Sequence, residues 1–144
     1  MLSILLMSLL TTHAKITPQG GPHLCDKREQ VLFSCALQNA SVVSLCASAD
    51  VAANAGTVQF RQGSRGRAEQ KFPEPANDWW HVFFFQRSPA KVTWKGHGNA
   101  YELSAQGLKT TTDEGDGDSA FMACTRPVTD NLQQLATLLP NAED

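Results

Sequence analysis

The sequence has few of the residues that build metal and catalytic sites, and those present are not spaced for such chemistry. Its 144 residues include four histidines and four cysteines. No two cysteines lie two to four residues apart, and no His-x-His or His-Glu-x-x-His pattern occurs, so the spacing typical of zinc sites is missing. The serines lack the Gly-x-Ser-x-Gly elbow of serine hydrolases. We therefore predict a protein that is not an enzyme and that uses no cofactor.

The chain also lacks a strong charge of either sign. Its formal net charge is -2 at pH 7, which is too small to indicate binding to nucleic acid or to a strongly acidic surface. Beyond the first residues, no segment is long and apolar enough to cross a membrane. The hydrophobic content of 42% is ordinary, so a folded chain is expected, and the length fits one domain.

The N-terminus has the pattern of a secretory signal peptide. Residues 1–10 form an apolar run, and Thr12 and Ala14 place small residues before a cleavage site after Ala14. No lysine or arginine precedes the run, and a buried N-terminal strand is the alternative. We predict a signal peptide over 1–14, a loose leader over 15–24 and a single disulfide-bonded β domain over 25–144. The domain would be periplasmic or secreted, with no stable membrane insertion after removal of the signal.

The stretch 31–48 predicts a β-hairpin that carries one cysteine in each strand. Its apolar residues alternate, as a half-buried strand requires. A two-residue loop at Ala40 and Ser41 would place Cys35 opposite Cys46, close enough for a disulfide. We favour that bridge together with Cys25–Cys124, although four cysteines allow three connectivities and the spacing leaves the others open. Export and disulfides support each other, because oxidising compartments preserve disulfides.

The rest of the chain alternates short strand patterns with turn residues. The segment from Asp78 to Gln86 is apolar on both faces, which predicts a central strand covered on both sides. Near the C-terminus, Asp130 can cap a helix, with Gln133 completing a capping box. Four leucines at helical spacing form its apolar stripe. The sequence thus predicts an all-β fold, mainly an antiparallel sandwich or distorted barrel, with one short C-terminal helix.

Three sequence patterns within residues 25–75 are similar to those of a known protein group. VLFSCALQNASVVSLCASAD, then VQFRQG, then the return to FPEP resemble an uncharacterised family of small secreted or periplasmic bacterial proteins with an FSC…VSLCAS…QFRxG pattern. The resemblance covers about residues 25–75. It implies export and a β-rich fold and transfers no catalytic residue, because the family has no established activity. The Trp79-Trp80 segment and the acidic loop at 113–118 depart from it.

Two groups of residues are candidates for contact with a partner. Arginines cluster at a predicted turn, and arginine makes forked contacts with carboxylates and is frequent at interfaces. An ordinary solvated hairpin tip is the alternative. Of the two adjacent tryptophans, one pointing outward would mark a binding surface, whereas burial of both is the alternative. The predicted partner-binding residues are Arg61, Arg65, Arg67, Trp79 and Trp80.

The acidic loop offers weak candidates for calcium ligands in Asp113, Asp116 and Asp118. The EF-hand order is absent, so a solvated loop is the alternative. We predict an extracytoplasmic, non-enzymatic protein-binding domain, in its most concrete form an inhibitor or immunity-type protein against an envelope or cell-wall enzyme. Its partner would be another envelope or secreted protein and not a nucleic acid. The alternatives are a secreted domain that binds calcium or a small ligand through this loop, and a small secreted hydrolase.

Overall fold

The fold class is confirmed by a computed structural model, which describes residues 21–64, 66–113 and 117–139. Over these residues, nine antiparallel strands form one curled sheet in the order β4-β3-β2-β1-β9-β8-β7-β6-β5. One half contains β1 (Gln30–Leu37), β2 (Val42–Ala47), β3 (Val58–Ser64) and β4 (Arg67–Phe72). The other contains β5 (Phe84–Arg87), β6 (Ala90–Gly96), β7 (Asn99–Ser104), β8 (Gly107–Thr112) and β9 (Ser119–Asp130).

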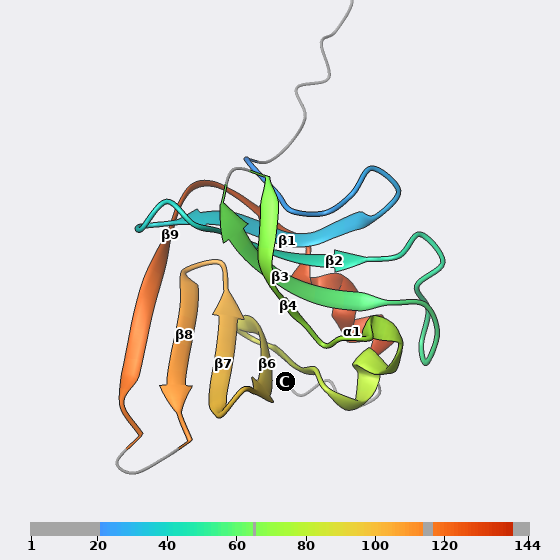
Figure 1. The fold of residues 1–144 in the computed structure, drawn as a ribbon. Helices are drawn as coiled ribbons and strands as arrows, with labels where there is room; N and C mark the ends of the chain where they lie inside the picture. Colours follow the sequence, from blue (N-terminus) through green and yellow to red (C-terminus); the bar gives the residue numbers. More distant parts are fainter. Residues whose placement is uncertain (1–20, 65, 114–116, 140–144) are drawn as a thin grey trace, which may run out of the picture.

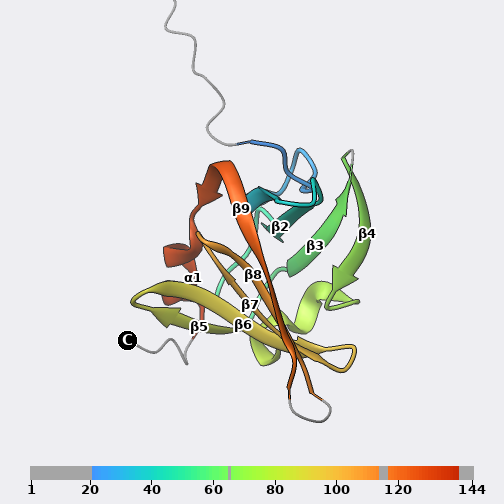
Figure 2. The same ribbon diagram turned by 90° about the vertical axis from the view of Figure 1, so that its left-hand side faces the viewer.

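Strand β9 belongs to both halves and is the place where the sheet turns. Its first residues, 119–123, pair with β8, whereas 124–130 pair with β1. Within the pairing with β1, the register shifts between Ser34 and Ala36, whose partners in β9 are Thr129 and Thr125, as at a β-bulge, and bulges bend strands. The sheet therefore curls into a half-barrel whose two halves face each other, as Figure 1 and the turned view in Figure 2 show.

The concave side of the half-barrel is filled with apolar side chains. Phe60 from the first half meets Trp94 from the second, with ring centroids 4.7 Å apart, and Trp94 stacks on Tyr101 at 5.3 Å. Leu132 and Leu135, from the helical segments η2 (Leu132–Gln134) and α1 (Leu135–Leu138), are fully buried in the same core. This filled interior leaves the outer surfaces of the sheet as the places where contacts can be made.

The hairpin of β1 and β2 forms as predicted, but its register differs. The turn spans residues 38–40, with Leu37 N–H donating to Ser41 O at 2.7 Å and Ala40 in the left-handed region at φ 67°. Cys35 therefore lies opposite Val43 rather than Cys46. Because Val43 and Cys46 are three residues apart, their side chains point to opposite faces of the sheet. The favoured Cys35–Cys46 bridge is wrong for this reason.

All four cysteines form disulfides, with a different connectivity. Cys25 pairs with Cys46 and Cys35 with Cys124, at Cα–Cα distances of 5.4 and 5.6 Å. Cys35 belongs to the buried core and ties β1 to β9, the junction between the two halves. Cys46 points to the outer side and holds the segment that precedes β1.

The segment expected to be one central strand instead contains a short helix and an edge strand. Residues Ala76–His81 form the 3₁₀ helix η1, and β5 begins only at Phe84. Trp79 and Phe83 are both buried and are four residues apart, which is the spacing of a helical turn, and Phe83 N–H donates to Trp79 O at 3.0 Å. Strand alternation would have placed His81 with them, but His81 is exposed.

The C-terminal helix exists but is shorter than predicted. Strand β9 continues to Asp130, so helical structure begins after it and α1 spans only Leu135–Leu138. The Asp130 carboxylate accepts a hydrogen bond from Leu132 N–H at 3.1 Å, as a cap would. Gln133 does not complete the box, because its side-chain amide donates to Arg87 O at 3.0 Å.

Candidate functional site

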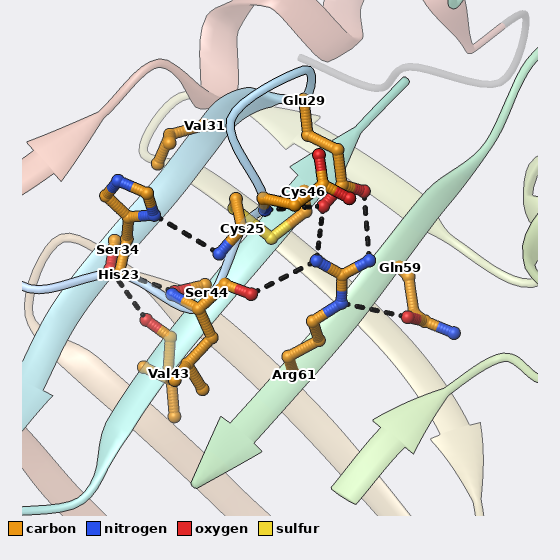
Figure 3. Close-up of a disulfide and its surroundings, with 12 residues drawn as sticks. His23, Cys25, Glu29, Val31, Ser34, Val43, Ser44, Cys46, Gln59 and Arg61 are labelled. Atoms are coloured by element: carbon orange, nitrogen blue, oxygen red, sulfur yellow. Dashed lines mark hydrogen bonds and ion pairs between the residues drawn. A yellow bond between two sulfur atoms is a disulfide. The ribbon is translucent and has the colours of Figure 1, made fainter. Parts of the chain in front are cut away.

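Arg61, the first of the predicted contact arginines, is bound within its own domain. Its guanidinium forms a two-pronged ion pair with the Glu29 carboxylate, in which Nη2 lies 2.9 Å from Oε2 (Figure 3). It also donates to Leu24 O at 3.1 Å and to Gln59 Oε1 at 2.9 Å. The Arg61 and Glu29 side chains are only 14% and 11% exposed. Four of the five N–H donors of Arg61 are thus bound within the protein itself.

The ion pair is part of a strap, residues 21–29, that covers the outer side of β1–β3. Ser44 Oγ accepts from Leu24 N–H at 2.9 Å, and Ser34 Oγ lies 2.7 Å from Pro22 O. The Cys25–Cys46 disulfide adds a covalent link at the same place (Figure 3). Ser34 and Ser44 are buried, and their hydroxyls also contact each other at 3.0 Å. The described end of the leader is therefore fixed to the sheet rather than loose.

The other predicted contact residues are dispersed. Arg65 lies outside the described residues, and Arg67 is exposed at the start of β4. Trp79 is fully buried, with its indole N–H donating to Ala55 O at 3.3 Å, so it does not reach the surface. Trp80 is half-buried and its ring lies 5.6 Å from that of His81, which is exposed. Of this set, Trp80 lies beside His81, which lines the groove described below.

The acidic loop is only partly covered by the structure. Asp113 and Asp118 are described, whereas Asp116 is not. Among residues 21–64, 66–113 and 117–139, no three His, Cys, Asp or Glu side chains lie close enough to hold a metal ion together. In the same ranges, no helix is long and apolar enough to cross a membrane.

The outer face of β5–β9, on the side away from the core, carries two exposed aromatic side chains. Phe84 and Phe121 are 54% and 53% exposed and are the exposed large hydrophobic residues of the described chain. They stand in one row across the five strands, because the pairing registers align them. From β5 to β9 this row reads Phe84, Thr93, Glu102, Lys109, Phe121. An aromatic ring therefore flanks each end of a polar row.

A groove of about 410 Å³ lies on this outer face, next to Phe84. Val82 and Phe84 supply apolar wall, and the short side chains of Thr93 and Ala100 leave the space between their longer neighbours. The groove volume falls within the range of ligand-binding clefts, about 300–1,000 Å³. A second hollow, of about 690 Å³, lies on β9 and is lined by Ala105, Gln106, Cys124, Arg126, Pro127, Val128 and Asp130. A third is lined mainly by polar residues: Glu69, Gln70, Lys71, Glu74, His97, Asn99 and Tyr101.

The charges around the groove are mostly positive. Lys91 pairs with Glu102 at 3.2 Å, whereas Lys95 and Lys109 have no ion-pair partner among the described residues. Both free lysines line the groove. The outer face thus carries an excess of lysine on a chain whose overall net charge is -2.

The sequence contained a signal for this face that the predictions did not use. Three consecutive phenylalanines, Phe83 to Phe85, cannot all point to one side of a strand, so one must face outward unless both sides are covered. In β6 the lysines Lys91 and Lys95 alternate with buried Val92 and Trp94, which marks the opposite side as polar. What the sequence did not show is that this side stays uncovered.

Comparison with known proteins adds no identity to this geometry: no family model, curated protein sequence or solved structure matches the chain.

Proposed function

We propose that the chain is an extracytoplasmic, non-enzymatic protein-binding domain that contacts its partner through the outer face of β5–β9. The supporting observation is the pair Phe84 and Phe121, both more than half exposed on the same face. Covering the exposed part of a phenylalanine ring, roughly 100 Å², stabilises a complex by about 2 kcal/mol. Contiguous exposed apolar area is typical of a protein-interaction surface, and Phe84 together with Val82 supplies such area at the groove.

The scaffold behind this face suits a binding role. Disulfides fix the strap to β2 and the two halves of the sheet to each other, which limits the entropy lost when a partner binds. Disulfides also persist in oxidising compartments, which supports a periplasmic or secreted location. The more specific form of the proposal is an inhibitor or immunity-type protein against an envelope or cell-wall enzyme.

The size of the face indicates that its rim takes part in binding. Five strands spaced about 4.8 Å apart, with about six residues each, present a flat area of roughly 400 Å². A standard protein interface buries about 800 Å² per partner. His81 lines the groove at the end of η1, and Trp80, whose ring lies 5.6 Å from that of His81, is placed to extend the contact.

The proposal is tested by comparing the intact face with an altered one. The oxidised protein is immobilised and exposed to envelope extract from its host, and retained proteins are identified by mass spectrometry. The double variant Phe84→Ser, Phe121→Ser is expected to lose the specific partner at least tenfold. The matched control Lys71→Ser, on exposed β4 in the other half, is expected to retain it. Equal retention by the double variant, or equal loss by the control, would contradict the proposal.

A further inference from the structure

The groove combines an apolar wall with free positive charge, and this combination restricts what fits it. Phe84 and Val82 line one side, and Lys95 and Lys109 project from β6 and β8. Glu102 lies between them, but its carboxylate is 3.2 Å from Lys91 Nζ, on the side of the row away from Lys95. The side of the groove toward Lys95 is therefore open to a second carboxylate.

From this arrangement we propose that the groove binds an extended acidic segment of a partner protein. An apolar side chain of the segment packs on Phe84 and Val82, and carboxylates two and four residues later face Lys95 and Lys109. The inference rests on the proposed protein-binding function and adds the chemistry of the partner.

The spacing of the strands gives this pattern. Phe84 on β5 and Lys109 on β8 are in one row, three strand spacings apart, which is about 14 Å. An extended segment advances about 3.4 Å per residue, so its residues i and i+4 are also about 14 Å apart and point to the same side. Residue i+2 falls between them, within reach of the flexible Lys95 side chain.

Two other occupants fit the charges less well. A second copy of the chain would bring the same lysine-rich face against itself, which is repulsive. A nucleic acid would meet only two free lysines beside Glu102 on a chain of net charge -2, whereas phosphate-backbone binding needs many cationic contacts.

The test uses three short peptides as probes against the oxidised, isotope-labelled protein. They are acetyl-Phe-Ala-Glu-Ala-Glu-amide, the same peptide with both glutamates replaced by glutamine, and the same with both replaced by lysine. Amide chemical shifts of Thr93, Ala100 and Thr111 report on the groove. The acidic peptide is expected to give saturable shifts there, with the glutamine peptide at least fivefold weaker and the lysine peptide not binding.

Variants of the protein distinguish the contribution of Lys95 and Lys109 to peptide binding from the effect of removing any positive charge. Lys95→Gln and Lys109→Gln are each expected to weaken the acidic peptide about two- to fivefold, as is usual for exposed ion pairs. The control Lys71→Gln, on exposed β4, is expected to leave binding unchanged. Unchanged binding after both groove substitutions would overturn the assignment of the lysines.

The remaining outcomes distinguish this inference from the proposed function. Equal binding of the acidic and glutamine peptides would overturn the acidic partner but leave protein binding at the face intact. Absence of shifts with every peptide would overturn the inference. The proposed function would still be supported if the immobilised protein retained a partner and the variant Phe84→Ser, Phe121→Ser lost it. Tighter binding of a short oligothymidylate at the same amides would overturn both.

Discussion

The strap offers a sharp test of the structure, through the substitution Arg61→Met. The guanidinium of Arg61 is bound by both Glu29 oxygens, by Leu24 O and by Gln59, in a setting where the two charged side chains are 14% and 11% exposed. Methionine keeps the apolar stem and removes every one of these contacts. The strap would then be held at this place by the Cys25–Cys46 disulfide and the serine hydrogen bonds alone.

The expected loss in the free energy of unfolding follows from the Glu29 carboxylate, which stays buried after Arg61 is replaced. Breaking a buried ion pair by removing one partner costs about 3–5 kcal/mol, because the other charge stays buried without compensation. The residual exposure of Glu29 lets water reach its carboxylate and lowers the expected cost to about 3 kcal/mol. For a domain of this length the melting temperature falls by about 3–4 °C per kcal/mol, so Tm is expected to fall by about 10 °C.

A double-mutant cycle separates the ion pair from lost packing. Removing both charges, Glu29→Leu with Arg61→Met, is expected to recover part of the loss, because no buried charge remains unpaired. Unfolding of the oxidised protein in guanidinium chloride, followed by tryptophan fluorescence, gives the free energies. The matched control is Lys91→Met, which breaks the more exposed Lys91–Glu102 pair and is expected to cost less than about 1 kcal/mol. An Arg61→Met loss no larger than this control would refute the reasoning.

Four further predictions concern the covalent frame, one turn and the outer face. Mass spectrometry of non-reduced fragments is expected to recover Cys25 linked to Cys46 and Cys35 linked to Cys124, and a Cys35–Cys46 fragment would contradict the register of the hairpin. Replacing both cysteines of the β1–β9 bridge by alanine is expected to lower the free energy of unfolding by about 4.6 kcal/mol, against about 3.3 for the strap bridge, because the chain-entropy model scales with the sequence separations, which are 89 and 21. The reverse order, measured by denaturation, would contradict this. Gly63→Ala is expected to cost at least about 2 kcal/mol, because an added Cβ would lie 1.9 Å from Arg67 O, and an unchanged Tm would show a different β3–β4 turn. Phe84→Ser and Phe121→Ser are each expected to lower the free energy of unfolding by about 1–2 kcal/mol, because more than half of each ring is already exposed, and a loss above about 3 kcal/mol would place these rings in the core rather than on a contact surface.

The fold class could be predicted because it depends on a local pattern. Alternation of apolar and polar residues is set within each strand, and turn residues separate the strands at regular intervals. The hairpin register could not be predicted in the same way. Its turn is one residue longer than assumed, and Ala40 takes a left-handed conformation that its residue type does not favour. The longer turn moved Cys35 to the face opposite Cys46, which changed the disulfide connectivity.

The candidate site was predicted less well, because it depends on contacts between distant segments. Arg61 reads as an exposed turn arginine until Glu29, 32 residues earlier, is placed beside it by the strap. Trp79 reads as a strand residue until a helical turn buries it. Conversely, Phe84 reads as part of a central strand, and it is exposed because the outer face of β5–β9 is uncovered there. Burial of a strand face is a property of the tertiary structure, and alternation alone does not report it.

The claim that the outer face of β5–β9 meets a protein partner is tested most directly by photo-crosslinking. A benzoylphenylalanine side chain replaces Phe84, Phe121 or, as control, Lys71, and the oxidised protein is irradiated in envelope extract from its host. Crosslinks from positions 84 and 121 to the same protein, with none from position 71, are the predicted result. Crosslinks from position 71 alone, or none from either phenylalanine position, would contradict the account.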